Sequence, residues 1–303
     1  MGGPAHHGPM SGQVNEQVRV RYGAFARDGG TNSGCCARSA TAPAGYATEL
    51  GLYAAEQLAA LPEEAVALSR GCGNPVGFAA LAPGERVVDF GYGGGIDVLL
   101  AANQVGDAGH VFGIDFTPEM IERAHGNVTT AGYQERVELA VADVTATGLP
   151  DGCADVVISN CVLNLCPDKA AAYREAYRLL VPGGRLAISD VLLHQPLPAP
   201  VAARLTEDWS GCLGGAVPTA DYLTIVAEAG FDHITEAGRH ELSEPELAQL
   251  ARCPGPDYTP APIEADLAAA TGQVYSIKFT ARKPEPHSSS GCGNSSVPST
   301  VTG

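Results

Sequence analysis

A glycine-rich turn that follows a short apolar segment is the feature that most constrains the fold of this chain. The segment is residues 86–90 (RVVDF), and the turn that follows is Gly91-Tyr92-Gly93-Gly94-Gly95. Glycine lets the backbone turn sharply from a strand into a helix and lets a ligand approach the main chain closely. This pattern predicts a buried parallel strand whose carboxyl end faces a ligand.

Strand and helix signals alternate on both sides of this turn. Further strands are predicted at 110–115, 137–142, 154–159 and 185–190, with a late antiparallel pair at 231–236 and 274–281. Helices are predicted at 48–61, 63–69, 96–102, 169–180 (ended by Pro182-Gly183-Gly184), 221–229 and from Pro118, with Thr117 as N-cap. This alternation is typical of a doubly wound α/β sheet. The segment 192–219 fits no standard crossover, and we expect it to cover a substrate.

The glycine turn does not match a dinucleotide fingerprint, whose sixth position is glycine or alanine. A count from Gly91 reaches Ile96 at that position, and a count from Gly93 also reaches a larger residue. S-adenosylmethionine has no pyrophosphate, and it suits an acidic residue followed by three alternating glycines. We therefore predict an S-adenosylmethionine site at Asp89, Gly91, Gly93 and Gly95, with Asp89 near the cationic amino acid end of the cofactor.

Two further acidic residues stand at the ends of the next two predicted strands. Asp115 ends the second strand, and its carboxylate can accept hydrogen bonds from both ribose hydroxyls. Asp143 follows the third strand and can accept from the adenine amino group, although a solvated loop carboxylate explains it equally well. Because doubly wound sheets bind ligands at their carboxyl edge, three acids at three strand ends favour a cofactor site.

The composition disfavours several kinds of partner. The 303 residues carry a formal net charge of −16, whereas nucleic acids and anionic membranes attract clustered Lys and Arg. No apolar run is long enough to span a bilayer, and residues 1–12 lack the basic start of a secretory signal. We expect a cytoplasmic, monomeric protein with no nucleic acid or membrane partner.

Nine cysteines should stay reduced in a cytosol, as ligands, nucleophiles or inert core residues. Cys161 follows the fourth predicted strand, Cys72 lies in a glycine-flanked loop that we expect to be exposed, and Cys212 lies in another glycine-rich segment. Cys35 and Cys36 are adjacent in a polar stretch. The absence of a C-x2-C pair disfavours a structural zinc site. Thiols on separate loops suit a soft centre with few ligands, such as trivalent arsenic.

The sequence resembles the arsenite methyltransferases over residues 18–283. The motifs that carry the resemblance are TNSGCC at 31–36, GCGNP at 71–75, the Asp89 glycine turn, DFTPEM at 115–120, SNCVLNL at 159–165 and WSGC at 209–212. The chain departs from the family at Tyr92, where a small residue is usual, and at Cys166, where serine is usual. We expect the Tyr92 ring to turn away from the cofactor.

The resemblance implies a class I methyltransferase sheet (doubly wound, Rossmann-like) with an N-terminal helical segment and a C-terminal substrate-binding region. It also implies that Phe116, Met120, Val144 and Asn160 contact the cofactor. The expected division is a disordered tail (1–15), an N-terminal segment with thiol loops (16–80), an S-adenosylmethionine-binding domain (81–191), an arsenic-binding and C-terminal region (192–283) and a second disordered tail (284–303).

In the family, the cysteines that match Cys161 and Cys212 hold arsenic. Those that match Cys72 and the pair Cys35 and Cys36 supply a third thiolate and a redox disulfide. The resemblance therefore implies methyl transfer from S-adenosylmethionine to arsenite and methylated arsenicals, with glutathione or thioredoxin as reductant, in arsenic detoxification.

Two other interpretations stay open at this point. One is a small-molecule C-, N- or O-methyltransferase of the quinone or sterol type, for which His194 or His110 would have to serve as base. The other is a thiol-rich arsenic-binding protein without catalysis, which should not bind S-adenosylmethionine.

Overall fold

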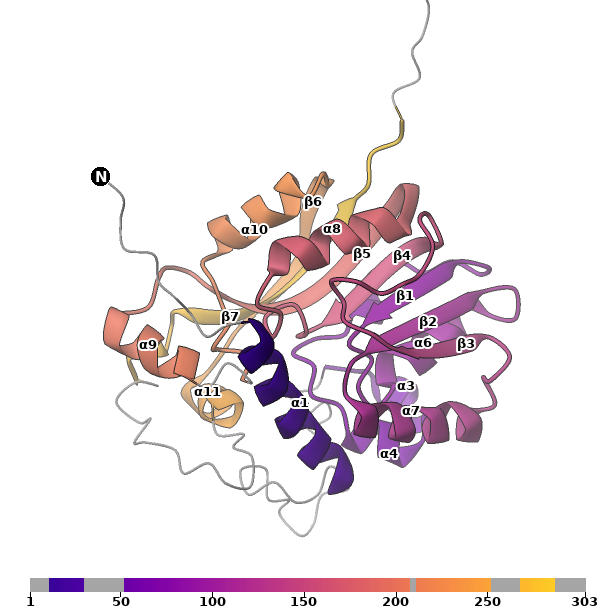
Figure 1. Ribbon diagram of the computed structural model, residues 1–303, viewed down its shortest axis with the longest axis horizontal. Helices are drawn as coiled ribbons and strands as arrows, with labels where there is room; N and C mark the ends of the chain where they lie inside the picture. The colour runs from indigo at the N-terminus through magenta and orange to yellow at the C-terminus, as the bar shows by residue number, and fades with distance from the viewer. Residues whose placement is uncertain (1–10, 30–51, 208–210, 252–267, 287–303) are drawn as a thin grey trace, which may run out of the picture.

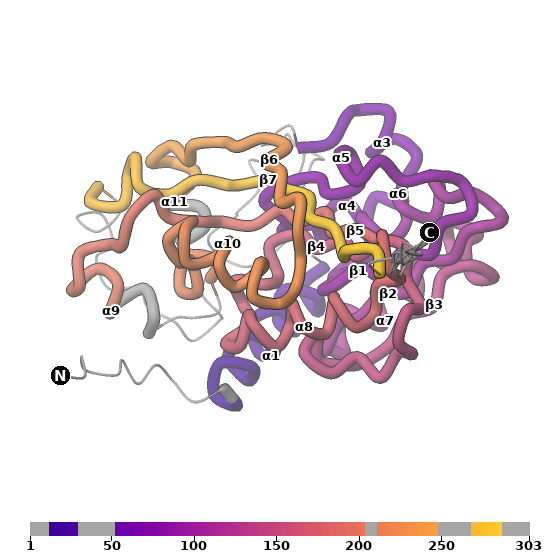
Figure 2. The backbone as a smooth tube through the Cα atoms, turned by 90° about the horizontal axis from the view of Figure 1, so that it is seen from above, coloured from indigo at the N-terminus to yellow at the C-terminus, as the bar shows by residue number. Residues whose placement is uncertain are grey.

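A seven-stranded mixed sheet forms the centre of the protein. The computed structural model describes residues 11–29, 52–207, 211–251 and 268–286. The strands are β1 (Arg86–Phe90), β2 (His110–Asp115), β3 (Val137–Val141), β4 (Ala154–Asn160), β5 (Leu180–Leu193), β6 (Asp232–Glu241) and β7 (Val274–Arg282). Their order across the sheet is β3-β2-β1-β4-β5-β7-β6. The first five strands are parallel, and β7 is antiparallel to both β5 and β6. Figure 2 shows β6 and β7 running side by side.

Helices cover both faces of the sheet (Figure 1). Those in the described residues are α1 (Ser11–Arg27), α3 (Ala55–Ala59), α4 (Glu63–Ala67), α5 (Pro75–Phe78), α6 (Ile96–Val105), α7 (Pro118–Ala131), α8 (Lys169–Leu179), α9 (Ala199–Glu207), α10 (Thr219–Glu228) and α11 (Glu244–Ala251). Helices α8 and α10 pack on one face, and α6 and α7 on the other. None of these described helices is long and apolar enough to cross a membrane.

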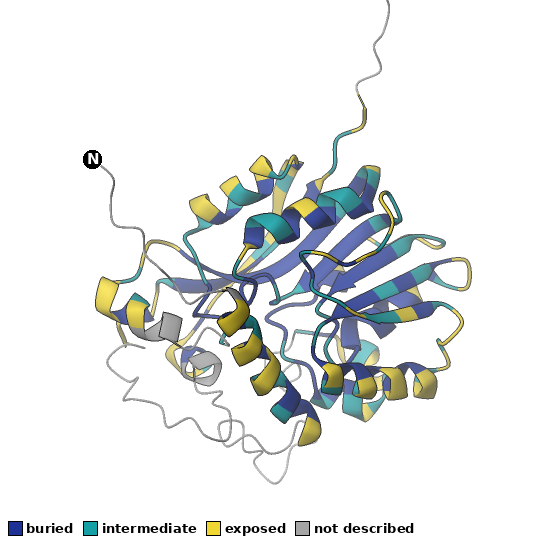
Figure 3. Cartoon of the chain, viewed as in Figure 1, coloured by how far each residue is buried: buried dark blue, intermediate teal, exposed yellow. Residues whose placement is uncertain are grey.

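The hydrophobic core lies in two layers, one on each face of the sheet. On one face Tyr173 of α8 and Tyr222 of α10 pack against sheet residues such as Phe279. On the other face Leu99 of α6 packs among side chains that include Val87. The central strands are therefore almost wholly buried (Figure 3), as expected for parallel strands covered on both faces.

A topological switch point lies between β1 and β4. The chain runs from β1 outward to β2 and β3, and then crosses back to place β4 on the other side of β1. Such a switch leaves a crevice outside the carboxyl ends of the two strands, where doubly wound sheets bind ligands. Gly91 follows β1 and Cys161 follows β4, so the glycine turn and one cysteine meet at this crevice.

The doubly wound fold predicted from the sequence is confirmed. All seven predicted strands are present, and the last two form the expected antiparallel pair. The fifth strand is longer than predicted, because Pro182-Gly183-Gly184 lie within β5 instead of between helix and strand. The pairing of β5 with β4 is irregular between Ala154 and Val156, and a strand tolerates proline at such an irregularity.

The N-terminal part differs most from the prediction. The predicted tail at 1–15 is wrong for residues 11–15, which begin α1. Val14 and Val18 are buried against Leu165, so the four-residue spacing of these valines was the overlooked helix signal. The predicted helix at 48–61 shrinks, within the described residues, to α3, and the next one ends at Ala67 instead of Ser69.

Two smaller expectations also need correction. Thr117 occupies the N-cap position of α7 but makes no side-chain capping bond; its backbone N–H donates to Asp115 instead. Most of the predicted tail at 284–303, from residue 287 onward, lies outside the described residues. Residues 1–10 of the other predicted tail also lie outside them.

The ring of Tyr92 packs directly against the backbone of Gly113 in β2, where there is no side chain to keep it away. A Cβ on Gly113 would lie 2.6 Å from Cδ1 of Tyr92 and 2.7 Å from Cδ2 of Leu139. We predict that Gly113→Ala lowers the free energy of unfolding by about 1–3 kcal/mol. In a Tyr92→Ser background the loss should shrink by at least about 0.5 kcal/mol, because the ring is gone. Urea denaturation of the four proteins measures this coupling, and an equal loss in both backgrounds would contradict the packing described.

Candidate active site

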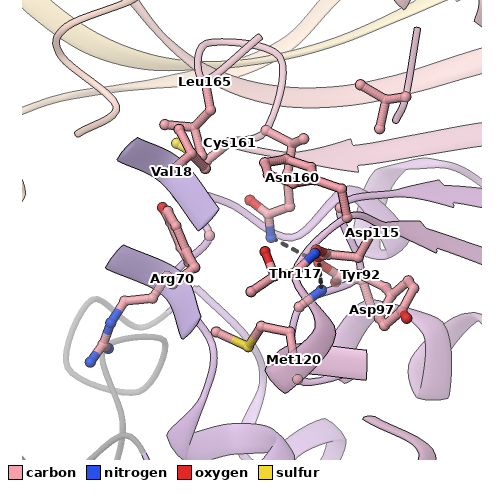
Figure 4. A pocket seen from close by; sticks show the side chains of 18 of the residues that line it. Val18, Arg70, Tyr92, Asp97, Asp115, Thr117, Met120, Asn160, Cys161 and Leu165 are labelled. Atoms are coloured by element: carbon pink, nitrogen blue, oxygen red, sulfur yellow. Dashed lines mark hydrogen bonds between the residues drawn. The ribbon is translucent and has the colours of Figure 1, made fainter. Parts of the chain in front are cut away.

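A cavity lies at the carboxyl edge of the sheet, outside the ends of β1 and β4. It contains about 920 Å³ of empty space, including its open mouth. Its walls come from α1, from the glycine turn and from the segments that follow β2, β3 and β4. Figure 4 shows Asp97, Asp115 and Asn160 on one side of it and Cys161 near Val18 on another.

The glycine turn forms the floor of this cavity through a backbone that other residues rarely adopt. Gly91, Gly93 and Gly95 have positive φ values of 77°, 49° and 94°, a region that favours glycine. A Cβ on Gly91 would also lie 2.1 Å from Cγ2 of Val162. Gly91 is therefore required both by its conformation and by the close approach of the segment that follows β4.

Two buried carboxyl groups on the cavity wall are held by hydrogen bonds. Asp115 accepts from the backbone N–H of Gly93 at 3.0 Å. Asp97, in the first turn of α6, accepts from the Tyr53 hydroxyl at 2.9 Å and from Nδ2 of Asn160 at 2.9 Å. These bonds fix both carboxyl groups at the crevice before any ligand arrives.

A third carboxyl group lies behind the wall without a full set of partners. Oδ2 of Asp89 is buried and has no hydrogen-bond partner among the described residues. Burial, and then repulsion from Asp97 and Asp115, raises the pKa of Asp89 well above its usual range. Burial also raises the pKa of Asp97 to about 6 and that of Asp115 above its ordinary value. Three crowded acids of this kind would be stabilised by a cationic ligand.

Most of the predicted cofactor residues line the cavity. Those that do so are Gly91, Gly93, Asp115, Phe116, Met120, Asp143, Val144 and Asn160. Asp89 and Gly95 are not in the wall, whereas Asp97, which the sequence analysis missed, is. An acidic residue in a first helical turn is ordinarily explained by the helix dipole, so only its burial distinguishes Asp97.

The packing of Tyr92 and the hydrogen bonding of Asp143 were not apparent from the sequence. The Tyr92 ring packs on Gly113 and Leu139, and its hydroxyl is buried with no hydrogen-bond partner in the described residues. Tyr92 nevertheless contributes to the cavity wall. Asp143 accepts from Nδ2 of Asn15 on α1 at 3.2 Å, so this helix is bonded to the segment that follows β3, and both residues line the cavity.

Three cysteines from distant parts of the chain converge beside the cavity. The Sγ atoms of Cys161 and Cys212 are 3.2 Å apart, and Sγ of Cys72 lies within 4.8 Å of Sγ of Cys161. All three are free thiols, and each is buried. Hydrogen bonds with Cys212 and Cys72, and then burial, raise the pKa of Cys161 well above its usual value. Cys161 is also part of the cavity wall.

The close approach of the Cys72 loop depends on its two glycines. A Cβ on Gly71 would lie 2.2 Å from Nδ2 of Asn160, and one on Gly73 would lie 1.9 Å from Oγ of Ser189. The loop was expected to be exposed, but Cys72 is only 5% exposed. The prediction of an exposed loop is therefore wrong, because the flanking glycines serve close packing instead of a surface turn.

Backbone strain marks the position of Cys161. Its φ is 66°, a left-handed conformation that is uncommon for residues other than glycine. Its backbone N–H donates to the carbonyl of Ser189 at 2.7 Å, so β5 holds the strained residue in place. This conformation turns the chain at the end of β4, where Cys161 reaches both the cavity and Cys212.

The remaining cysteines divide between the described residues and the rest of the chain. Cys166 lines the cavity, and burial raises its pKa to about 11. Cys153 lies just before β4, at the opposite edge of the sheet from Cys161. The cysteines outside the described residues are the predicted pair Cys35 and Cys36, together with Cys253 and Cys292.

Two buried charged groups near the thiols were missed by the sequence analysis. A carboxylate oxygen of Asp190 lies within 4.8 Å of the Sγ atoms of Cys72 and Cys161. Nζ of Lys169 donates to the carbonyls of Asn164 and Cys166 at 3.3 Å. The signal for Asp190 was available: like Asp89 and Asp115, it is an acid toward the carboxyl end of an apolar strand.

The fold and the cavity together are typical of the class I S-adenosylmethionine-dependent methyltransferases. A family described as a methyltransferase domain matches residues 81–230 of the chain. The chain is 40% identical to an arsenite methyltransferase of Halobacterium salinarum, over 77% of this chain and 61% of that protein. It is 31% identical, with a TM-score of 0.61, to a crystal structure of an arsenic (III) S-adenosylmethionine methyltransferase from Chlamydomonas reinhardtii, over 77% and 73% of the two chains. This protein belongs to the arsenite methyltransferase family.

Two further comparisons set the limits of this family likeness. An arsenite methyltransferase of Aquipseudomonas alcaligenes is 33% identical over 78% of this chain, and the chain spans 64% of that protein. The chain thus covers about three fifths of these curated relatives. The [4+2]-cyclase SpnF has a similar fold (TM-score 0.56) at 20% identity, so the chemistry must be argued from the site and not from the fold.

The pKa of Asp97 generates a prediction for cofactor binding. If ionised Asp97 faces a cationic ligand, protonation of Asp97 competes with binding. The affinity for S-adenosylmethionine should therefore fall as the pH falls through about 6, by up to about tenfold per pH unit, since binding then releases one proton. Calorimetry between about pH 5 and about pH 8 measures this slope.

Two variants control this experiment. Asp97→Asn should bind the cofactor more weakly at neutral pH and should lose most of the pH dependence. Glu138→Gln, which replaces an exposed carboxylate on β3, should keep the slope of the original protein. An Asp97→Asn variant with an unchanged slope would show that another group is responsible.

Proposed function

We propose that this protein transfers methyl groups from S-adenosylmethionine to trivalent arsenic held by Cys161, Cys212 and Cys72. The observation that carries the proposal is the convergence of three buried free thiols beside a cavity of which Cys161 is a wall. Names of relatives in the family support the substrate: they are arsenite methyltransferases. The proposed physiological role is arsenic detoxification.

The residues of the cavity fit S-adenosylmethionine. The cofactor carries a positive sulfonium and a positive amino group, and the cavity offers Asp97 and Asp115 with Asp89 behind them. Asp115 has the position at the end of β2 where a carboxylate can accept from ribose hydroxyls. When bound, S-adenosylmethionine would supply an electrophilic methyl group that the arsenic lone pair can attack, with the S–C bonding electrons left on the cofactor sulfur as a neutral thioether.

Binding of arsenite at the thiols needs no net uptake or release of protons. Each thiol forms an As–S bond, and its proton leaves with one arsenic hydroxyl as water. Arsenic held by three sulfurs keeps its lone pair, and no proton has to be removed from it before methyl transfer. The protein therefore contributes mainly position and exclusion of water, which the burial of Cys72, Cys161 and Cys212 supplies.

Each methyl transfer converts arsenic formally from the trivalent to the pentavalent state. Two thiols return two electrons to arsenic when they lose their protons and form a disulfide. We assign this role to Cys72 and one member of the pair Cys35 and Cys36. Glutathione or a thioredoxin-type dithiol would then reopen the disulfide by thiol–disulfide exchange.

The rival methyltransferase interpretation has neither of its two candidate histidines at the cavity. Methylation of a carbon, nitrogen or oxygen acceptor usually requires removal of a proton. His194 stacks on Tyr275 and bonds to Glu241, and His110 packs beside Phe112. Neither histidine belongs to the cavity wall, so neither is placed to serve as the base that this interpretation assigned to it.

Serine variants of the three cysteines test the proposal, because the first and second methylation steps need different numbers of thiolates. Arsenite needs three thiolates, whereas trivalent methylarsenite already has one bond to carbon and needs two. Cys161→Ser and Cys212→Ser should therefore lose activity on both substrates, by at least about 10²-fold. Cys72→Ser should fail on arsenite yet still methylate methylarsenite when a dithiol is added. Incubation with cofactor, followed by arsenic speciation of the products, measures each activity.

The control is Cys153→Ser, because this thiol lies at the other edge of the sheet; it should keep full activity on both substrates. A Cys72→Ser enzyme that methylates arsenite at the normal rate would remove Cys72 from the site. Activity of Cys161→Ser on methylarsenite would overturn the whole assignment. Arsenic binding without cofactor binding and without methylation would identify an arsenic-binding protein instead of an enzyme.

A further inference from the structure

Asp190 is a buried carboxylate in the thiol cluster that the proposed methyl transfer does not use. It is fully buried, and one of its oxygens lies within 4.8 Å of the Sγ atoms of Cys72 and Cys161. Its Oδ2 accepts from the Tyr222 hydroxyl at 2.8 Å, and its Oδ1 accepts from the backbone N–H of Val191 at 3.0 Å. Each carboxylate oxygen accepts more than one bond, so Asp190 retains a lone pair for a ligand.

Two thiols and one carboxylate are a known type of ligand set for a thiophilic divalent cation. Zinc is held tetrahedrally, with Zn–S bonds of about 2.3 Å and Zn–O bonds of about 2.0–2.2 Å, and a fourth position is often left to water. Ligand atoms of such a tetrahedron are about 3.5–3.8 Å apart. The three atoms here lie within 4.8 Å of one another, so side-chain movements of about 1 Å complete the geometry.

The charges around this set also suit a divalent cation. Two thiolates and one carboxylate carry three negative charges. A bound divalent cation neutralises two of them and leaves one net negative charge. Lys169, buried in the adjacent segment, is attracted electrostatically to Asp190, and its positive charge balances the remainder. A buried site with nearly balanced charge avoids the desolvation penalty of an unpaired ion.

This set shares thiols with the proposed arsenic site but is not the same set. Cys212 lies 3.2 Å from Cys161, yet within the described residues the compact group that suits a metal ion is Cys72, Cys161 and Asp190. The third ligand differs between the two sets. For arsenic it would be the sulfur of Cys212, and for a divalent cation it would be a carboxylate oxygen of Asp190. Cys72 and Cys161 are common to both.

We propose that Cys72, Cys161 and Asp190 form a binding site for a thiophilic divalent cation of the zinc and cadmium class, which competes with arsenic for the two shared thiols. On binding, the two S–H bonds break, two metal–sulfur bonds and one metal–oxygen bond form, and two protons pass to solvent. No electron is transferred. The competition rests on the proposed function, whereas the cation site itself does not.

Cadmium titration of the full-length protein tests the site without any arsenic. The protein is kept reduced with a phosphine, which adds no thiol, and the ultraviolet absorption of cadmium–thiolate bonds is followed. Asp190→Asn, Cys72→Ser and Cys161→Ser should each weaken cadmium binding at least about tenfold. Cys212→Ser and Cys153→Ser should bind as tightly as the original protein. Cadmium bound elsewhere, for example at Cys35 and Cys36, is present in all of these proteins and cancels in the comparison.

Unchanged cadmium affinity in Asp190→Asn, or a loss in Cys212→Ser equal to that in Cys72→Ser, would overturn the site. X-ray absorption at the cadmium edge is measured on the unaltered protein, so this test does not depend on whether the variants fold. With one equivalent of cadmium, X-ray absorption should show two sulfur neighbours and the remainder oxygen. A shell of three or four sulfurs would also overturn the proposal.

Inhibition of arsenite methylation by cadmium then tests the competition separately. We expect added arsenite to relieve the inhibition, because both ions require Cys72 and Cys161. Inhibition that arsenite does not relieve would contradict competition at shared thiols. If cadmium binds as described but no arsenic is methylated in its absence, the proposed function fails and the cation site stands.

Discussion

The side chain of Asn160 holds the two halves of the site together. Its Oδ1 accepts from the backbone N–H of Gly73 at 3.1 Å, and its Nδ2 donates to the carbonyl of Gly73 at 2.8 Å and to Asp97 at 2.9 Å. The next residue is Cys161. One amide at the end of β4 therefore fixes the Cys72 loop on one side and a cavity carboxylate on the other, and the proposed chemistry depends on both.

The site concentrates groups that are unfavourable in a buried environment. Asp89, Asp97 and Asp115 crowd together at the cavity, and Cys161 has a strained backbone among neighbouring thiols. Such an arrangement is stabilised when its ligands arrive: a cationic cofactor for the acids, and a soft centre for the thiols. The rigid sheet and the two core layers supply the stability that offsets this local strain.

The sequence predicted the parts of the structure that depend on local patterns. Short apolar runs with acids at their ends located β1 and β2, and the glycine turn located the cavity at the carboxyl edge of the sheet, because neighbouring residues carry these signals. The burial of Cys72 and the placement of Asp190 beside the thiols were not predictable in this way. Each depends on contacts between segments far apart in the chain, such as Cys72 with Ser189, and spacing along one chain does not reveal them.

X-ray absorption at the arsenic edge tests the central claim most directly, since it counts the atoms bonded to arsenic. With one equivalent of arsenite and no added thiol, the protein should show three sulfur neighbours and no oxygen. Cys72→Ser should replace one of these sulfurs by oxygen, and Cys153→Ser should leave the shell unchanged. An unaltered protein that binds arsenic through fewer than three sulfurs, or a Cys72→Ser variant with all three, would contradict the account.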